Sequence, residues 1–344
     1  METDAQIRDL AENPDWLLQK VQGDTMQYVF AHISRNTYSD SSFLDHRTSP
    51  VPTEVKSAGV KAVNQLMDSS SRPANYIFHS AFCCSTLFSN CLQTASDSLV
   101  LKEPYVLVQL ANVLHQADKS RNFNRSKWQA ILKPGLQLLE KTYPDQQGVI
   151  IKPSNSANNL LEYIMELRSS STVFMYGSLE DFLLSNLKSP EESRYMVPLF
   201  LKRLYPLADY AKDLPISEIL KLSHLQQCAM LWHAQVYRFS SLAASKGNAP
   251  VFCLAANDFL HDPESIVSKV LDFFDLACNN ERLQQLTTDG PLSRHSKSGQ
   301  HYNPETRSLE NTALRTKHAD ILKSTHRWMD RILNRFPVKQ PLCS

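Results

Sequence analysis

YIFHSAFCCSTLF, residues 76–88, is the stretch that decides the fold of this chain. Its first residues are aromatic, β-branched and apolar, which predicts a buried strand over 75–79. After a short loop, the hydroxyl residues Ser85 and Thr86 open a helix predicted over 85–96. A helix start presents unpaired N–H groups and the positive end of the helix dipole, so it favours a bound anion. Ser85 either donates to that anion or caps the helix.

Beyond this stretch, short apolar runs alternate with helical patterns. Strands are predicted at 75–79, 98–102, 148–152, 172–176 and 250–256, and helices at 85–96, 105–117, 127–142, 156–168, 179–188, 193–210 and 216–246. This alternation predicts an α/β fold with a mostly parallel central sheet and helices on both faces. Ligands of such sheets bind at the carboxyl ends of the strands. The loop after His79, Lys102-Glu103, Lys152 and Gly177 therefore surround one predicted crevice.

Both ends of the chain carry helical patterns without the alternating strands predicted for the middle. Residues 1–35 and 54–67 carry apolar positions at helical spacing, which predicts a helical N-terminal extension over 1–72 packing on a core domain over 73–344. The turn-rich stretch between these helices ends in residues 42–47, SFLDHR. Residues 305–335 read as one long amphipathic helix with a solvated face.

Composition excludes several classes of protein. The chain has 344 residues, 42% of them hydrophobic, and a net charge of +1, so no basic excess points to nucleic acid. No apolar run is long enough for a transmembrane helix, and no secretory signal is visible at the start. The seven scattered cysteines fit free thiols, and His295, His301 and Cys278 lack metal-ligand spacing. We expect a cytoplasmic protein without a metal, and the oligomeric state stays open.

Two familiar anion loops do not fit residues 76–88. A Walker loop needs two glycines and a lysine before Ser/Thr, and this loop has neither, which disfavours an ATPase or kinase. A cysteine phosphatase loop places an arginine six residues after the nucleophile. The positions six residues after Cys83 and Cys84 hold Ser89 and Asn90.

The chain instead resembles the P-loop sulfotransferase superfamily over roughly residues 75–303. The matching segments follow in order, at 84–88 (CSTLF), 101–104 (LKEP), 149–153 (VIIKP), 173–185 (VFMYGSLEDFLLS), 257–264 (NDFLHDPE) and 294–297 (RHSK). The resemblance implies a P-loop nucleoside triphosphate hydrolase-like fold. It also implies transfer of a sulfuryl group from 3′-phosphoadenosine 5′-phosphosulfate (PAPS) to a hydroxyl or amine of a small acceptor.

The resemblance also implies roles for residues of this chain. The residues implied to hold PAPS are Cys83, Cys84, Ser85, Thr86, Leu87, Ser185, Arg294 and Lys297. Glu103 or His79 would be the general base, and Lys152 would assist at the sulfuryl oxygens. We expect burial to raise the pKa of Glu103 toward neutrality, as a base requires. The alternative for Glu103 is an ion-pair partner, and for His79 a structural hydrogen-bonding group.

Two positions depart from the family pattern. Phe82 stands where the loop carries a basic residue, and Gly177 stands where an arginine grips the 3′-phosphate. An arginine–phosphate contact is bidentate and hard to replace. A non-catalytic relative that binds a ligand or a partner is therefore the main alternative function, and a divergent kinase is a third.

Overall fold

The computed structural model describes residues 3–23, 25–47, 51–67, 72–117, 124–245, 249–288, 290–293 and 304–338. At its centre is a five-stranded parallel sheet in the order β5-β6-β4-β7-β8. The strands are β4 (Asn75–His79), β5 (Ser98–Lys102), β6 (Gly148–Lys152), β7 (Thr172–Tyr176) and β8 (Val251–Ala255). The predicted α/β class is confirmed, and the first four strands have the predicted bounds.

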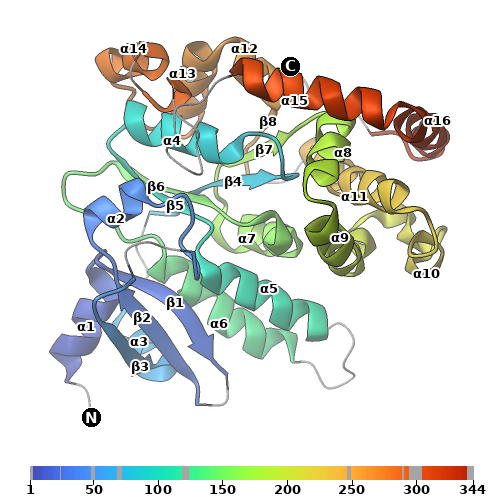
Figure 1. The fold of residues 1–344 in the computed structure, drawn as a ribbon. Helices are drawn as coiled ribbons and strands as arrows, with labels where there is room; N and C mark the ends of the chain where they lie inside the picture. The colour runs from blue at the N-terminus through green and yellow to red at the C-terminus, as the bar shows by residue number, and fades with distance from the viewer. Residues whose placement is uncertain are drawn as a thin grey trace.

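Alternate side chains of these strands enter two different cores, which is why the strands are apolar throughout. Tyr76 and Phe78 of β4 belong to one core, whereas Ile77 belongs to the other. Figure 1 shows the helices that cover the two faces. They are α4 (Ser85–Ala95), α13 (Pro263–Phe273) and α14 (Asn280–Thr288) on one side, and α5 (Tyr105–Ala117), α6 (Arg125–Leu138) and α7 (Leu161–Arg168) on the other.

The strand order places a switch point beside β4. The chain passes from β4 to the outer strand β5, returns through β6, and then crosses β4 to reach β7. Ligands of open α/β sheets bind where the strand order reverses, beyond the carboxyl ends of the strands. The loop after His79 lies at this point.

Two helices after β7 differ from the prediction, and the one expected over 216–246 is divided in two at residues 220–223, which include no proline. The helix predicted over 193–210 is α9 (Pro190–Leu204), which ends just before Pro206. Proline lacks the N–H that a helix interior needs. The rest of this region contains α8 (Leu179–Lys188), the 3-10 turns Tyr205–Leu207 and Asp209–Lys212, α10 (Ile216–Ile219), α11 (His224–Ala244) and α12 (Ala256–His261).

The prediction of a helical N-terminal extension is wrong for most of its residues. After α1 (Asp4–Glu12) the chain forms an antiparallel sheet of β1 (Trp16–Gln22), β2 (Gln27–His32) and β3 (Val55–Gly59), with α2 (Arg35–Asp40) and α3 (Val60–Leu66) beside it. Pro14 follows the end of α1, and Gly23 opens the turn between β1 and β2. These turn residues override the helical spacing of the apolar positions.

The antiparallel sheet packs against α5 and α6. Tyr28 and Phe30 of β2 share one apolar core with Leu110 of α5 and Leu136 of α6. Gln109 of α5 also exchanges two hydrogen bonds with the backbone of Val21, at 2.8 and 2.7 Å. On this packing we propose that residues 1–72 extend the core domain of residues 73–344.

The predicted C-terminal helix is two helices, α15 (Pro304–Lys317) and α16 (Ala319–Arg335), which meet at His318. The buried face of α16 includes Leu322 and Met329, which join the core of α8, α9 and α11. None of the described helices is long and apolar enough to span a membrane.

The ion pair of Arg168 and Glu140 is buried, with side chains 7% and 0% exposed. Glu140 also accepts a hydrogen bond from the Ala74 N–H just before β4, at 3.3 Å. We expect Arg168→Met to lower the free energy of unfolding by about 3–5 kcal/mol, because it leaves a buried carboxylate unpaired. Urea denaturation followed by circular dichroism measures this change.

The control for that change is Arg8→Ala, which breaks the exposed ion pair with Glu12. We expect it to change the free energy of unfolding by less than about 0.5 kcal/mol. Equal small effects of the two substitutions would contradict a structural role for the buried pair.

Candidate functional site

The loop between β4 and α4 makes a tight turn without a glycine. Ala81, Phe82 and Cys84 adopt positive φ angles of 69°, 51° and 61°. Such angles are uncommon for residues other than glycine and cost on the order of 1 kcal/mol each. Strain of this kind persists where the surroundings fix the backbone, and it often marks functional sites.

Neighbouring elements hold this loop in place. The Ser80 N–H donates to the Met175 carbonyl at 3.0 Å, and the Gly177 N–H donates to Ser80 Oγ at 3.3 Å. The Asn158 side-chain amide donates to the His79 carbonyl at 3.0 Å and to Gln235 Oε1 at 3.0 Å. Contacts from β7, the 3-10 turn Asn155–Leu160 and α11 therefore fix the position of the loop.

The start of α4 has hydrogen-bond donors that no side chain caps. No side chain caps this helix, and its N-cap residue Cys84 is in the left-handed conformation. The first N–H groups of an α-helix have no acceptor within the helix. Among the described residues, the Ser85 and Thr86 hydroxyl groups also have no hydrogen-bond partner. This helix start can therefore bind an anion through both backbone and hydroxyl donors.

His79 is hydrogen-bonded through both ring nitrogens. The Ala81 N–H donates to Nδ1 at 3.2 Å, so Nδ1 carries no proton. The proton on Nε2 then points to the Pro153 carbonyl, 3.1 Å away. The ring is 95% buried and shapes the loop, so the structure favours the structural alternative for His79 over the general base.

Glu103 and Lys152 form a buried ion pair at the ends of β5 and β6. Lys152 Nζ donates to Glu103 Oε1 at 2.6 Å, and the lysine side chain is 0% exposed. Glu103 has a positive φ of 57°, and its N–H donates to the Lys152 carbonyl at 2.7 Å. The crevice predicted from the strand ends thus brings these two residues together.

The expected pKa of Glu103 is wrong in direction. Burial alone would raise the pKa, but the charge and hydrogen bond of Lys152, with a smaller contribution from Arg47, outweigh burial and lower it to about 2. A carboxylate with such a low pKa is a weak proton acceptor near neutral pH. The ion-pair alternative therefore describes Glu103 in this structure.

Phe82 and Gly177, the two positions that depart from the sulfotransferase motif, are both packed against neighbouring side chains. Phe82 is 42% exposed and packs edge-on against Phe182, with 5.4 Å between ring centroids. Gly177 is buried, and the Trp232 indole N–H of α11 donates to its carbonyl at 2.9 Å. An added Cβ at Gly177 would lie 3.4 Å from the Cβ of Cys83. The loop and α11 thus pack closely around Gly177, where the sequence resemblance expected an arginine.

For the other residues predicted to hold PAPS, the described part of the chain shows no contact that supports the predicted role. The Cys83 thiol is buried, and burial raises its pKa to about 12, so it is not a nucleophile. Ser185 is half-buried on α8, and within the described residues no hydrogen bond joins it to the loop. Arg294 and Lys297 lie outside the described residues.

Two residues at the crevice were missed from the sequence. Arg47 and Phe43, from the stretch read only as a polar turn, reach Glu103 and Lys152. Lys102, which the sequence already placed at the crevice, is buried and donates to the Ser39 carbonyl at 3.0 Å and to Asn90 Oδ1 at 3.1 Å; burial lowers its pKa to about 8. The sequence signal for Arg47 and Phe43 was the stretch 42–47 (SFLDHR), in which Asp45 and Arg47 follow closely on Phe43.

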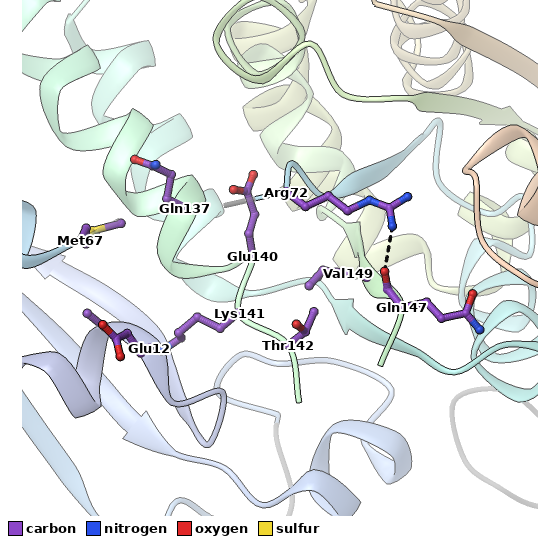
Figure 2. Close-up of a pocket in the computed structure, with 11 residues that line it drawn as sticks. Glu12, Met67, Arg72, Gln137, Glu140, Lys141, Thr142, Gln147 and Val149 are labelled. Atoms are coloured by element: carbon purple, nitrogen blue, oxygen red, sulfur yellow. Dashed lines mark hydrogen bonds between the residues drawn. The ribbon is translucent and has the colours of Figure 1, made fainter. Parts of the chain in front are cut away.

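A cavity of about 330 Å³ lies at the opposite, amino-terminal end of the strands. Figure 2 shows Glu140, Lys141 and Arg72 among its lining residues. Lys141 Nζ donates to the Leu10 carbonyl at 2.9 Å, and Arg72 donates to the Gln147 carbonyl at 3.0 Å. These charges join the N-terminal layer to the sheet. Within the described ranges, no group of His, Cys, Asp and Glu could hold a metal ion.

Comparisons with known proteins return sulfotransferase structures. No family model and no curated protein matches the chain. The sulfotransferase domain from the curacin biosynthetic pathway is 13% identical, with a TM-score of 0.42 over 79% of this chain and 100% of that domain. A sulfotransferase from Alicyclobacillus acidocaldarius is 12% identical, with a TM-score of 0.36 over 74% of this chain and 96% of the other.

The sulfotransferase domain of the Synechococcus PCC 7002 olefin synthase is 12% identical, with a TM-score of 0.39 over 73% of this chain and 97% of that domain. At TM-scores below 0.5, these similarities assign no role to any residue of this chain.

Glu103→Gln tests the ion pair through the pH dependence of stability. The pKa of Glu103 is about 2 in the folded protein and about 4.3 in an unfolded chain. Its contribution, on the order of 3 kcal/mol, is therefore complete above about pH 5 and lost as the pH falls toward 2. We expect the variant to be less stable than the parent at pH 7 and the difference to shrink below pH 5. Urea denaturation at pH 7, 5 and 3 measures this.

Glu54→Gln is the control, because Glu54 pairs with Lys56 while 53% exposed. We expect little change at any pH from this substitution. A difference between the parent and Glu103→Gln that stays constant from pH 7 to pH 3 would contradict the low pKa of Glu103.

Proposed function

We propose that this chain is a sulfotransferase that binds the 5′-phosphosulfate of PAPS at the start of α4. The sulfuryl group is then transferred to a hydroxyl or amine of a small acceptor. The observation that carries the proposal is the uncapped helix start at the switch point, with the Ser85 and Thr86 hydroxyl groups unengaged within the described part of the chain. The resemblance of residues 84–88 and 101–104 to the family motifs supports the same assignment.

The chemistry asks mainly for positioning and for stabilisation of charge on oxygen. Sulfuryl transfer is analogous to phosphoryl transfer through a loose transition state, which needs little covalent chemistry from the protein. The fixed N–H groups and hydroxyl groups at the start of α4 supply donors for the oxygens of the donor. Lys152 adds a positive charge near the loop, since it acts to lower the pKa of the buried Cys83 thiol against the larger effect of burial.

Neither His79 nor Glu103, the two candidates from the sequence, is arranged in this structure to act as the general base. His79 uses Nδ1 to accept from Ala81, and Glu103 is held ionised by Lys152. We therefore give Glu103 a positioning role toward Lys152. The acceptor's proton is removed by a group that the acceptor itself brings into the crevice or by solvent.

A second candidate function is a non-catalytic protein that retains the fold and binds an anionic ligand or a partner. Trp232 lies against Gly177, where the family arginine would stand, and Phe82 supplies no charge to the loop. Both features would lower the affinity for PAPS, but they leave the N–H and hydroxyl groups at the start of α4 in place. Binding and turnover therefore have to be measured separately.

Calorimetric titration with 3′-phosphoadenosine 5′-phosphate, with AMP and ATP as controls, tests the proposal. We expect micromolar binding that requires the 3′-phosphate. The Ser85→Ala/Thr86→Val variant should bind more weakly by about a hundredfold or more, because it loses two hydroxyl donors to a charged group. The control is Thr94→Val on the same helix, because the Thr94 hydroxyl already donates to the Asn90 carbonyl.

Absence of binding by the folded parent would reject PAPS as the ligand. Binding without sulfuryl transfer to any hydroxyl or amine acceptor would favour the non-catalytic alternative. Equal affinities of the parent and the Ser85/Thr86 variant would mean that the anion lies elsewhere.

A further inference from the structure

Arg47 lies on a segment that crosses the carboxyl end of β5. The Leu44 N–H donates to the Lys102 carbonyl at 2.6 Å, and the Tyr105 N–H donates to the Leu44 carbonyl at 3.1 Å. The segment is therefore bound on both sides of Glu103. It brings a residue of the N-terminal extension to the edge of the sheet where ligands bind.

The guanidinium group of Arg47 is held in a defined orientation. It stacks over the Phe43 ring at 3.7 Å, and its Nε donates to both carboxylate oxygens of Asp45 at 2.9 Å. Nη2 donates to Asp45 as well and to Glu103 Oε2 at 3.2 Å. A planar cation fixed in this way loses little conformational freedom when it binds another group.

One edge of this guanidinium group remains available. Nη1 has no acceptor among the described residues, and the side chain is 45% exposed. Lys152, the other cation bound to Glu103, is 0% exposed. Of these two cations, Arg47 is the one that a ligand in the crevice can reach without a rearrangement.

The contacts also connect Arg47 to the anion loop. Glu103 joins it to Lys152, and the next residue, Pro153, accepts a hydrogen bond from His79 at the loop entrance. The loop itself lacks a cation because position 82 is a phenylalanine. The loop thus carries no charge of its own, and Arg47 is the fixed, half-exposed cation that these contacts link to it.

We propose that Arg47 binds the 5′-phosphosulfate end of the donor through Nη1, in place of the basic residue that the loop lacks. This inference rests on the proposed function and deepens it, because it assigns a donor-binding residue to the N-terminal extension. The competing explanation is that Arg47 only fastens the segment 43–47 to Glu103. The two explanations differ in which ligand groups the residue affects.

Titrating two ligands against three variants separates these explanations. The ligands are 3′-phosphoadenosine 5′-phosphate and adenosine 3′-phosphate, which lacks the 5′-phosphate. We expect Arg47→Ala to weaken binding of the first roughly ten- to a hundredfold and that of the second by less than about twofold. Arg47→Lys should recover part of the loss, since it keeps the charge but not the planar fork.

The matched control is Arg35→Ala. Arg35 also belongs to the N-terminal extension, is 48% exposed and binds Asp145 through two hydrogen bonds of 2.9 and 2.7 Å. We expect it to change neither affinity, and circular dichroism of each variant confirms that it is folded.

The outcomes are distinct. Equal weakening of both ligands by Arg47→Ala, or no weakening of either, would overturn the role of Arg47 while leaving the proposed function in place. Failure of the parent to bind either nucleotide would overturn the proposed function and this inference with it.

Discussion

The buried ion pair of Lys152 and Glu103 is the interaction on which the candidate site depends. Neither charge is stable alone at this depth, because a buried charge without its partner is strongly destabilising. The pair joins the ends of β5 and β6, and Arg47 adds the N-terminal segment to it. Three parts of the chain that are distant in sequence are thereby held together at the carboxyl edge of the sheet.

Backbone strain is concentrated at the same edge. Of the seven positive-φ residues other than glycine in the described ranges, Ala81, Phe82, Cys84 and Glu103 lie here. Glu103 is fixed by the Lys152 carbonyl, and the loop of the other three residues is fixed at Ser80 by the Met175 carbonyl. Such strain is retained only where the surrounding structure enforces it. The sheet and α11 therefore stabilise a loop whose own residues would favour a different conformation.

The sequence predicted the parts of the fold whose signals are local. Four strands had the predicted bounds because each is a short apolar run closed by a polar residue or a turn. The N-terminal sheet was missed because helical spacing was weighted above the turn residues Pro14 and Gly23. The contact of Arg47 with Glu103 could not be predicted, since the two residues are 56 positions apart in sequence. The predicted direction of the Glu103 pKa shift was wrong for the same reason: the direction is set by neighbouring charges whose positions the sequence does not show.

The helix α11 holds the loop after β4 and the end of β7 in place beside the candidate anion site. Trp232 binds the Gly177 carbonyl, and Gln235 binds Asn158 and the Ser80 carbonyl, the latter at 3.4 Å. These contacts fix the carboxyl ends of β4 and β7 and use none of the donors at the start of α4. A helix start needs only fixed geometry to bind an anion, whereas transfer also needs a proton acceptor near the acceptor substrate. On the proposed function, binding at the start of α4 and turnover are therefore separate requirements, and turnover depends on what enters beside Arg47.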